Sequence, residues 1–307
     1  MAAVTSALSQ HRKPAYLRRL ELWGLAFVLP TVLFFFIFYI FPIVYGFYLS
    51  LTDFNLLRAP SFIGLANFQS LLKDRLFQRS VLVTLGFVFG STLPVWVLSL
   101  LAAKLFFQRF PGRDALKLMF MSPLMPSLVV VSLIWKILFY PNGPMTALVG
   151  RLFGTGEIRW LNDILLSPIT IIVANAWTTI PFYMLIWLAG LTGIPVELHD
   201  AARVDGANGR QFFFGVELPL LRPTAIFVAA ITSINAFQGF TLQYSLSPDQ
   251  GGPAGANTTL GVLIWKEGFQ YYHMGNAAAI SVVLFALIML VTVLQLLWGR
   301  SGDYSIQ

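Results

Sequence analysis

The residues from Leu22 to Thr52 form an apolar run that contains no charged side chain. A helix needs about 20 predominantly apolar residues to cross the hydrocarbon core of a bilayer. A secretory signal has an apolar region of only about 7–15 residues followed by a small-residue cleavage site, and this run is longer and has no such site. The run therefore predicts a retained membrane helix, with kinks at Pro30 and Pro42.

The composition of the whole chain also indicates a membrane protein. Of its 307 residues, 57% are hydrophobic and 11% are charged, whereas a soluble domain is about 25% charged. The net charge of +7 would suit nucleic acid, but no basic face interleaved with aromatic residues accompanies it. We therefore expect no nucleic-acid partner. The absence of cysteine excludes disulfides and thiolate metal sites.

Six segments are long and apolar enough to span a bilayer. The sequence therefore predicts an all-α integral membrane protein with six transmembrane helices in a domain covering 22–300. This domain follows an N-terminal segment, 1–21, and precedes a tail, 301–307. The six predicted spans are 22–51, 80–103, 116–140, 167–191, 222–244 and 275–298.

The distribution of Lys and Arg predicts the orientation of these spans. Twelve of the 20 basic residues fall on the side of the N-terminus, seven fall on the other side, and Lys136 lies within the third span. Because basic residues gather on the cytoplasmic side, we expect both termini to be cytoplasmic. Lys136 follows Trp135 and is interpreted as a lysine that snorkels to the interface, with a role in a translocation path as the alternative.

Two loops on the outer side look ordered. In the first, 59–74, a turn precedes a short amphipathic helix with Phe68, Leu71 and Leu72 on one face. In the second, 247–276, a turn-rich patch leads into an aromatic helix.

The loop at 195–219 carries many charges between two apolar spans. Pro195 can begin a helix that runs to Asp205, and Gly206 can take the left-handed conformation that ends it. A second short helix follows until Pro219, with Phe212, Phe213 and Val216 on one side. Each helix is about 15–18 Å long, which is too short to cross a bilayer. We therefore place the 195–219 loop on the cytoplasmic face.

The first of these helices presents the small residues Ala201 and Ala202 between charged neighbours. Small residues allow the backbone of a partner to come close, and charges fix the register of docking. The helix pair is therefore interpreted as a docking element for another protein, with an ordinary amphipathic surface pair as the alternative.

The stretch "DAARVDGANGRQFFFGVELPLLRP" resembles the EAA loop of ABC importer permeases. That pattern reads Glu-Ala-Ala, two variable residues, Asp-Gly-Ala, a spacer, and then an apolar residue, any residue and Leu-Pro. Here Asp200 stands where the family has Glu, so the acid is one methylene shorter. The residues that the resemblance assigns to coupling are Asp200, Ala201, Ala202, Arg203, Asp205, Gly206 and Ala207.

The resemblance covers about residues 22–300 and is closest to carbohydrate-type permeases, the relatives of maltose and glycerol-phosphate importers. It is carried by "FPIVYGFYLSLTDFNLL", "FIGLANFQSLL", "MFMSPLMPSLVVVSLIWKILFYPNGPMTALV", "AAAISVVLFALIML" and the "GGP" at 251–253. It implies the type I ABC importer permease fold, with a coupling helix seated in a cleft of the ATPase, and a bacterial cytoplasmic (inner) membrane location.

The same resemblance implies the partners. These are a second permease subunit in a heterodimer, two copies of a cytoplasmic ATPase, an extracytoplasmic solute-binding protein and membrane lipid. The chain has no Gly-rich loop that ends in Gly-Lys-Ser or Gly-Lys-Thr. We therefore expect ATP and Mg²⁺ to bind the partner ATPase, with no cofactor and no catalytic residue in this chain. His11, His199 and His273 show no metal-ligand spacing.

A sugar site needs amides, hydroxyls and aromatic faces. Such residues concentrate in the fourth and fifth spans, and polar residues inside a membrane tend to face a pathway. The alternative for each is a hydrogen bond between helices. The residues expected to line a substrate path are Asn175, Trp177, Thr178, Tyr183, Asn235, Gln238 and Tyr244; Thr179, Thr232, Ser233, Phe237, Gln243, Asn276 and Ser281 add further candidates.

Three alternative functions remain. The same machinery could carry glycerol phosphate or another small solute, although the spans show almost no basic residue. A secondary ion-coupled transporter would usually need an intramembrane carboxylate or His and inverted repeats, and neither is found in the sequence. The third alternative is a membrane scaffold that has no transport role.

Overall fold

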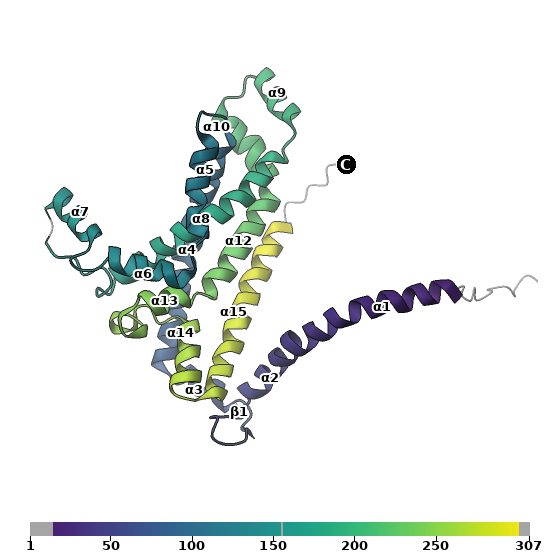
Figure 1. Cartoon of the computed structure of the whole chain (residues 1–307), viewed down its shortest axis with the longest axis vertical. Helices are drawn as coiled ribbons and strands as arrows, with labels where there is room; N and C mark the ends of the chain where they lie inside the picture. The colour runs from purple at the N-terminus through teal and green to yellow at the C-terminus, as the bar shows by residue number, and fades with distance from the viewer. Residues whose placement is uncertain (1–14, 155, 301–307) are drawn as a thin grey trace, which may run out of the picture.

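The computed structural model describes residues 15–154 and 156–300, and most of them are helical (Figure 1). The described strands are β1 (Thr52–Asp53) and β2 (Ser61–Phe62), which pair antiparallel. The predicted segments 1–14 and 301–307, with His11, lie outside the described residues.

The first predicted span is a long arm that leaves the body of the molecule (Figure 1). It consists of α1 (Ala15–Phe35), a π-helical turn η1 (Phe36–Ile40) and α2 (Phe41–Ser50). Because Pro42 has no N–H group, the regular ladder cannot continue through it, and the N–H of Phe41 instead reaches the carbonyl of Phe36. Side chains from Trp23 to Val44 are exposed, and α2 packs against the last helix, where Phe47 meets Phe285 edge-on at 6.0 Å.

The short amphipathic helix of the first outer loop is α3 (Ala66–Lys73). Leu71 is buried, but Leu72 is 71% exposed, so its placement on the apolar face is wrong. Leu72 lies one residue, and therefore about 100° of helical rotation, beyond Leu71. The next helix, α4 (Arg75–Phe107), is longer than the predicted 80–103 at both ends and is capped by Asp74, which accepts a 2.8 Å hydrogen bond from the Leu76 N–H.

The third predicted span is wrong as a single helix. It is divided into α5 (Arg113–Met121), the 3₁₀ turn η2 (Ser122–Leu124) and α6 (Leu128–Leu138), and the two arms meet at 97°. Pro123 and Pro126 interrupt the helical ladder, and Ser127 starts α6 by accepting a hydrogen bond from the Val130 N–H. The chain then forms α7 (Pro144–Phe153).

The fourth predicted span is one helix, α8 (Leu166–Thr192). The fifth is wrong at its outer end, because α12 (Arg222–Phe237) stops before Gln238-Gly239 and a separate short helix, α13 (Thr241–Leu246), follows. Between these spans lie α9 (Val196–Val204), α10 (Gly209–Phe212), the π-helical turn η3 (Phe213–Glu217) and α11 (Leu218–Leu220). The segment 209–220 meets α12 at 68°.

The second outer loop contains the 3₁₀ turns η4 (Pro248–Gln250) and η5 (Pro253–Gly255). The predicted aromatic helix is α14 (Leu260–Trp265) with the π-helical turn η6 (Lys266–Gln270). The last predicted span, 275–298, coincides with α15 (Met274–Arg300). Within residues 15–154 and 156–300, four helical stretches are thus long and apolar enough to cross a membrane, or up to six if each bent pair counts as one span.

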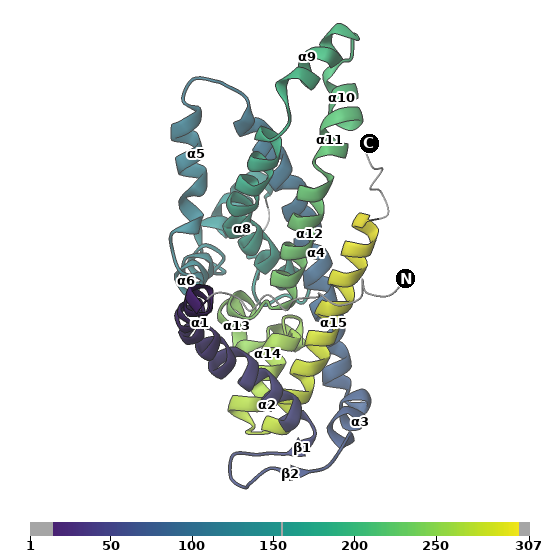
Figure 2. The same cartoon turned by 90° about the vertical axis from the view of Figure 1, so that its right-hand side faces the viewer.

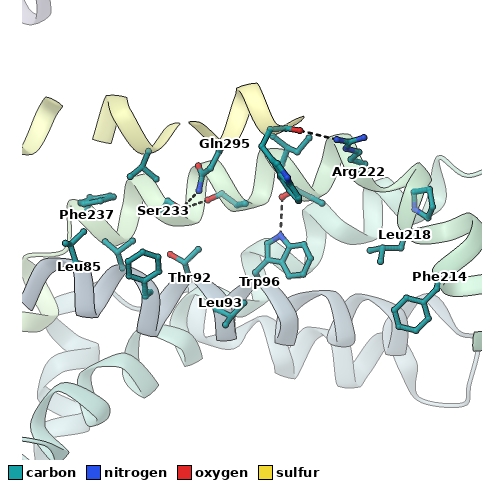
Figure 3. A pocket seen from close by; sticks show the side chains of 18 residues that line it. Leu85, Thr92, Leu93, Trp96, Phe214, Leu218, Arg222, Ser233, Phe237 and Gln295 are labelled. Carbon is teal, nitrogen blue, oxygen red and sulfur yellow. Dashed lines mark hydrogen bonds between the residues drawn. The ribbon is translucent and has the colours of Figure 1, made fainter. Parts of the chain in front are cut away.

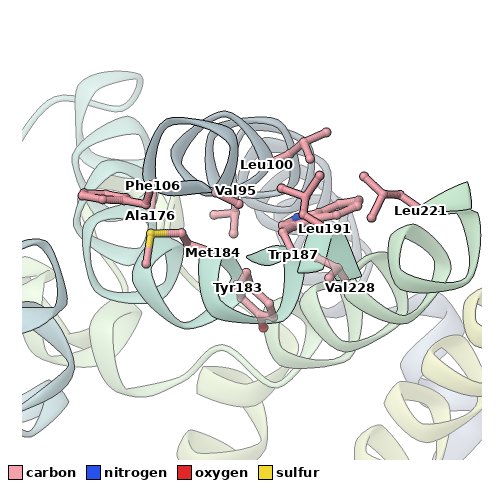
Figure 4. Packing of buried hydrophobic residues seen from close by; sticks show 11 residues of the cluster. Val95, Leu100, Phe106, Ala176, Tyr183, Met184, Trp187, Leu191, Leu221 and Val228 are labelled. Atoms are coloured by element: carbon pink, nitrogen blue, oxygen red, sulfur yellow. The ribbon is translucent and has the colours of Figure 1, made fainter. Parts of the chain in front are cut away.

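The helices α4, α8, α12 and α15 pack side by side as the body of the molecule (Figures 1 and 2). Hydrogen bonds tie α12 to its neighbours. Among them, the Trp96 indole donates to the Ala225 carbonyl at 3.1 Å, and the Gln295 amide donates to Ser233 Oγ at 2.8 Å (Figure 3). At the centre, Trp187 is fully buried among Val95, Leu100 and Met184 (Figure 4), and burying a large apolar side chain stabilises by about 1.5–3 kcal/mol.

The two ends of the bundle differ. The 195–219 loop and the end of α15 lie at one end, and β1, β2 and α3 lie at the other (Figures 1 and 2). The candidate functional residues are therefore divided between a projecting loop at one end and the interior between α4, α8 and α12.

Candidate functional site: a projecting loop and a polar cavity

The helix α9 stands at the tip of the molecule and contains no buried residue (Figure 1). Pro195 is its N-cap with an extended ψ of 135°, rather than its first helical residue. Asp200 and Ala201 are exposed, and Ala202 is half-buried. The helix is therefore held only at its ends and along one side, and most of its surface is free to contact another molecule.

Gly206 has the left-handed backbone that the sequence predicts, with φ of +74°. This turn ends α9, because the N–H of Ala207 bonds to the Ala202 carbonyl at 2.9 Å. No neighbour lies within 4 Å of the position that a Cβ at Gly206 would occupy. Glycine is therefore required at this turn by its left-handed backbone conformation and not by a lack of space for a side chain.

The second half of the loop fixes α9 to the body. Asn208 and Gln211 form a capping box at the start of α10, and the His199 ring on α9 lies 4.1 Å from that of Phe212 on α10. His199 thus has a packing partner.

A buried carboxylate follows in the same loop. Glu217 is 6% exposed, and its Oε2 lies 2.6 Å from the Nζ of Lys104, near the end of α4. The same ammonium lies 3.8 Å from the ring centre of Phe213. An unpaired buried carboxylate would be costly, so this ion pair and its cation–π contact fasten the loop to α4.

A small polar cavity of about 20 Å³ lies between α4, α8 and α12. That volume holds about one water molecule. Most of its lining is uncharged and polar, and the lining residues are Ser91, Thr92, Val95, Asn175, Thr179, Tyr183, Thr232, Asn235 and Ala236.

Two of the predicted path residues meet directly at this cavity. The Asn235 amide donates a 2.8 Å hydrogen bond to the Tyr183 hydroxyl, joining α12 to α8. Asn175 lies on the same cavity wall. The sequence reasoning missed Ser91 and Thr92 of α4, although the Ser-Thr pair in an apolar span is the signal that could have found them.

The structure places the other predicted path residues outside this cavity. The Thr178 hydroxyl donates to the Asn175 carbonyl of its own helix at 2.8 Å. Trp177 is 41% exposed and lies 6.0 Å from the ring of Trp135. Gln238 is exposed beyond the end of α12, and the ring of Tyr244 lies 4.6 Å from that of Trp265.

The additional polar candidates mostly make structural bonds. The hydroxyls of Thr232, Ser233 and Ser281 each donate to a carbonyl one turn back in their own helix. Asn276 donates to the carboxylate of the buried Glu267 at 3.0 Å, and Phe237 belongs to the apolar interior.

The second outer loop brings a lysine under a glycine-rich turn. The Nζ of Lys266 lies 2.9 Å from the position that a Cβ at Gly251 would take. Burial lowers the pKa of Lys266, and the nearby charge of Asp249 partly opposes that shift. Among the described residues, no three His, Asp or Glu side chains come together as a metal site.

Residues 96–300 match the family model described as "Binding-protein-dependent transport system inner membrane component". This match covers most of the chain, from within α4 to the end of α15, and it includes α9 and the cavity residues of α8 and α12. The chain belongs to this family. It is a membrane permease subunit of an ABC importer.

Curated relatives agree with the family. The permease is 31% identical to the trehalose/maltose transport system permease protein MalF of Thermococcus litoralis, over 90% of this chain and 93% of that protein. It is also 31% identical to the sn-glycerol-3-phosphate transport system permease protein UgpA of Agrobacterium fabrum, over 76% of this chain and 80% of that protein.

A solved structure supports the fold of the permease. A chain of a bacterial alginate ABC transporter, crystallised with a periplasmic protein bound to alginate pentasaccharide, aligns with a TM-score of 0.80. The alignment covers 91% of this chain and 94% of that chain at 21% identity. The predicted all-α membrane fold and the predicted family are therefore confirmed.

Proposed function

We propose that this permease moves a neutral sugar or related polyol across the bacterial cytoplasmic membrane, driven by a separate ATPase. The side chains that line the cavity between α4, α8 and α12 are uncharged, and amides and hydroxyls dominate them. Such groups can exchange hydrogen bonds with sugar hydroxyls. The relative named for trehalose and maltose supports this substrate class.

The observation that carries the coupling proposal is the exposure of α9 at the tip of the molecule. We infer that Asp200, Ala201, Ala202, Arg203, Asp205, Gly206 and Ala207 dock on the cytoplasmic ATPase. ATP and Mg²⁺ bind on that partner, and this chain contributes neither a cofactor site nor a catalytic residue. The Lys104–Glu217 pair then transmits movement of the loop to α4.

The exposed arm supports a second permease as a partner. Its 28 residues from Trp23 to Ser50 are strongly apolar, and the side chains from Trp23 to Val44 are exposed. A length of apolar helix that contacts so little of its own chain is available to a second permease and to lipid. We therefore propose a heterodimer, with two ATPase copies and an extracytoplasmic solute-binding protein completing the assembly.

The proposed orientation of the chain in the membrane follows from the position of the 195–219 loop. If α9 meets a cytoplasmic ATPase, the end of α15 at that end of the bundle is also cytoplasmic (Figure 2). The hairpin β1–β2, α3 and the 247–276 loop then face the solute-binding protein. With six crossings, the N-terminus is cytoplasmic as well.

The transport step is a population shift. Closure of the two ATPases on ATP favours one arrangement of the two coupling loops, and release favours the other. A partner can shift an equilibrium only as far as it binds the two states unequally. The spans thereby alternate between outward-open and inward-open states.

Uptake by proteoliposomes tests this function. The full assembly, with its second permease, ATPase and binding protein, is expected to accumulate a labelled sugar only with ATP inside. A parallel assay with labelled glycerol phosphate tests the alternative suggested by the UgpA relative. Uptake that persists without ATP would contradict the proposal.

A further inference from the structure

A long groove of about 770 Å³ runs between α4, α12 and α15, apart from the polar cavity (Figure 3). Its walls are apolar, with Leu93 from α4, Ile226 and Ala229 from α12, and Val291 from α15. Two of the donors that line the groove are used between helices: the Trp96 indole bonds to the Ala225 carbonyl, and the Gln295 amide bonds to Ser233. Because most of its lining is apolar, the groove suits a hydrocarbon.

A guanidinium lines this groove at the start of α12, next to the 195–219 loop. One nitrogen of Arg222 donates to the Trp298 carbonyl at 3.1 Å, which fixes the side chain beside an exposed tryptophan (Figure 3). No ion pair of the described residues includes Arg222. A guanidinium has five N–H donors, so most of them remain for an anion, and its fork matches the oxygens of a phosphate.

The groove is elongated. It follows α12 from Arg222 to Phe237, a length of about 22 Å at 1.5 Å per residue. An extended acyl chain can lie along a groove of this length.

We propose that the groove binds an anionic glycerophospholipid, with an acyl chain along α12 and the phosphate on Arg222. Basic pockets between transmembrane helices are suited to acidic lipid headgroups, and each buried methylene contributes about 0.8 kcal/mol. Under the proposed orientation, this lipid belongs to the cytoplasmic leaflet. It would stabilise the contact of α15 with α4 and α12 close to the 195–219 loop.

Native mass spectrometry of the whole assembly, loaded with phosphatidylglycerol or phosphatidylcholine, tests the proposal. The wild type should retain phosphatidylglycerol in preference to phosphatidylcholine, and inorganic phosphate should not displace it. Arg222→Gln should weaken this retention about tenfold, the effect of a hydrogen bond to a charged group. Ala229→Phe, which fills the groove, should also weaken it, and Arg109→Gln, an exposed control, should not.

Equal retention of phosphatidylglycerol by the wild type, Arg222→Gln and Ala229→Phe would overturn the proposal. So would cross-linking of a cysteine at Ala229 to the second permease, because a protein helix would then occupy the groove. The chain has no native cysteine, so such a cross-link reports this position alone. Neither result depends on which solute is transported.

Discussion

The Lys104 ammonium lies 2.6 Å from a carboxylate oxygen of Glu217 and joins the end of α4 to the 195–219 loop. The lysine side chain is 31% exposed and the glutamate side chain is 8% exposed. Removing one member of a buried pair leaves the other charge unpaired, which costs about 3–5 kcal/mol in a fully buried site. Partial exposure of the lysine reduces this cost through solvent screening.

We predict that Lys104→Met lowers the free energy of unfolding by about 1–3 kcal/mol and reduces the ATP-driven uptake rate. The double variant Lys104→Met/Glu217→Leu should recover most of the stability, since no unpaired charge remains. Thermal unfolding in detergent measures both. A Lys104→Met variant as stable as the wild type would show that the pair does not hold the loop.

Gly206 provides a second test of the loop. Gly206→Val places a β-branched residue at φ of +74°, which costs about 1–2 kcal/mol in the left-handed region. We expect normal membrane insertion but a lower ATPase rate in the assembly, because the end of α9 is displaced. Gly209→Val is the matched control: it lies in the same loop without positive φ and with no neighbour within 4 Å. Equal ATPase rates for the two variants would contradict the account of this turn.

The hydrogen bond from Asn235 to Tyr183 tests the substrate path. Tyr183→Phe and Asn235→Ala each remove this bond between α8 and α12 and each take a polar group from the cavity lining. If a polar group contributes about 0.5–1.5 kcal/mol to substrate binding, the apparent KM for uptake should rise about two- to tenfold. The free-energy change that corresponds to the KM of the double variant should be smaller than the sum of the changes for the two single variants, because both substitutions remove the same bond. Ser281→Ala, which breaks only a bond within α15, should leave KM unchanged, and a strictly additive double variant would count against a shared bond.

Gly275 tests the packing at the opposite end of the bundle. A Cβ there would collide with the Thr52 carbonyl oxygen, because the N–H of Gly275 is bonded to the Phe54 carbonyl at 2.9 Å. Gly275→Ala should therefore lower the melting temperature. Gly86→Ala, in α4 with no neighbour within 4 Å, should preserve or raise it, since alanine favours a helix by about 1 kcal/mol. The opposite order of melting temperatures would contradict this contact.

The long uncharged helices could be predicted from the sequence because hydropathy alone determines them. α8 and α15 coincide closely with their predicted ranges. The third and fifth spans could not, since a hydropathy window records how apolar a segment is and not its direction. Pro123 and Pro126 bend one segment by 97°, and Gln238-Gly239 ends α12 early.

The candidate site was predictable only in part. Polar residues in apolar spans pointed to Tyr183 and Asn235, which meet. The same reasoning also selected Thr178, which bonds to its own helix, because composition does not say toward which neighbour a side chain points. The pairing of Lys104 with Glu217 spans 113 residues, and no local pattern predicts it.

The most direct measurement of the central claim is disulfide cross-linking between α9 and the ATPase in the complete assembly. The chain has no cysteine, so Ala201→Cys, exposed on α9, provides a unique probe. It should cross-link to a cysteine in a surface cleft of the ATPase, with a yield that changes when ATP is added. Leu72→Cys, exposed on α3 at the opposite end, should give no cross-link to the ATPase. Cross-linking of Leu72→Cys, with none from Ala201→Cys, would contradict the account.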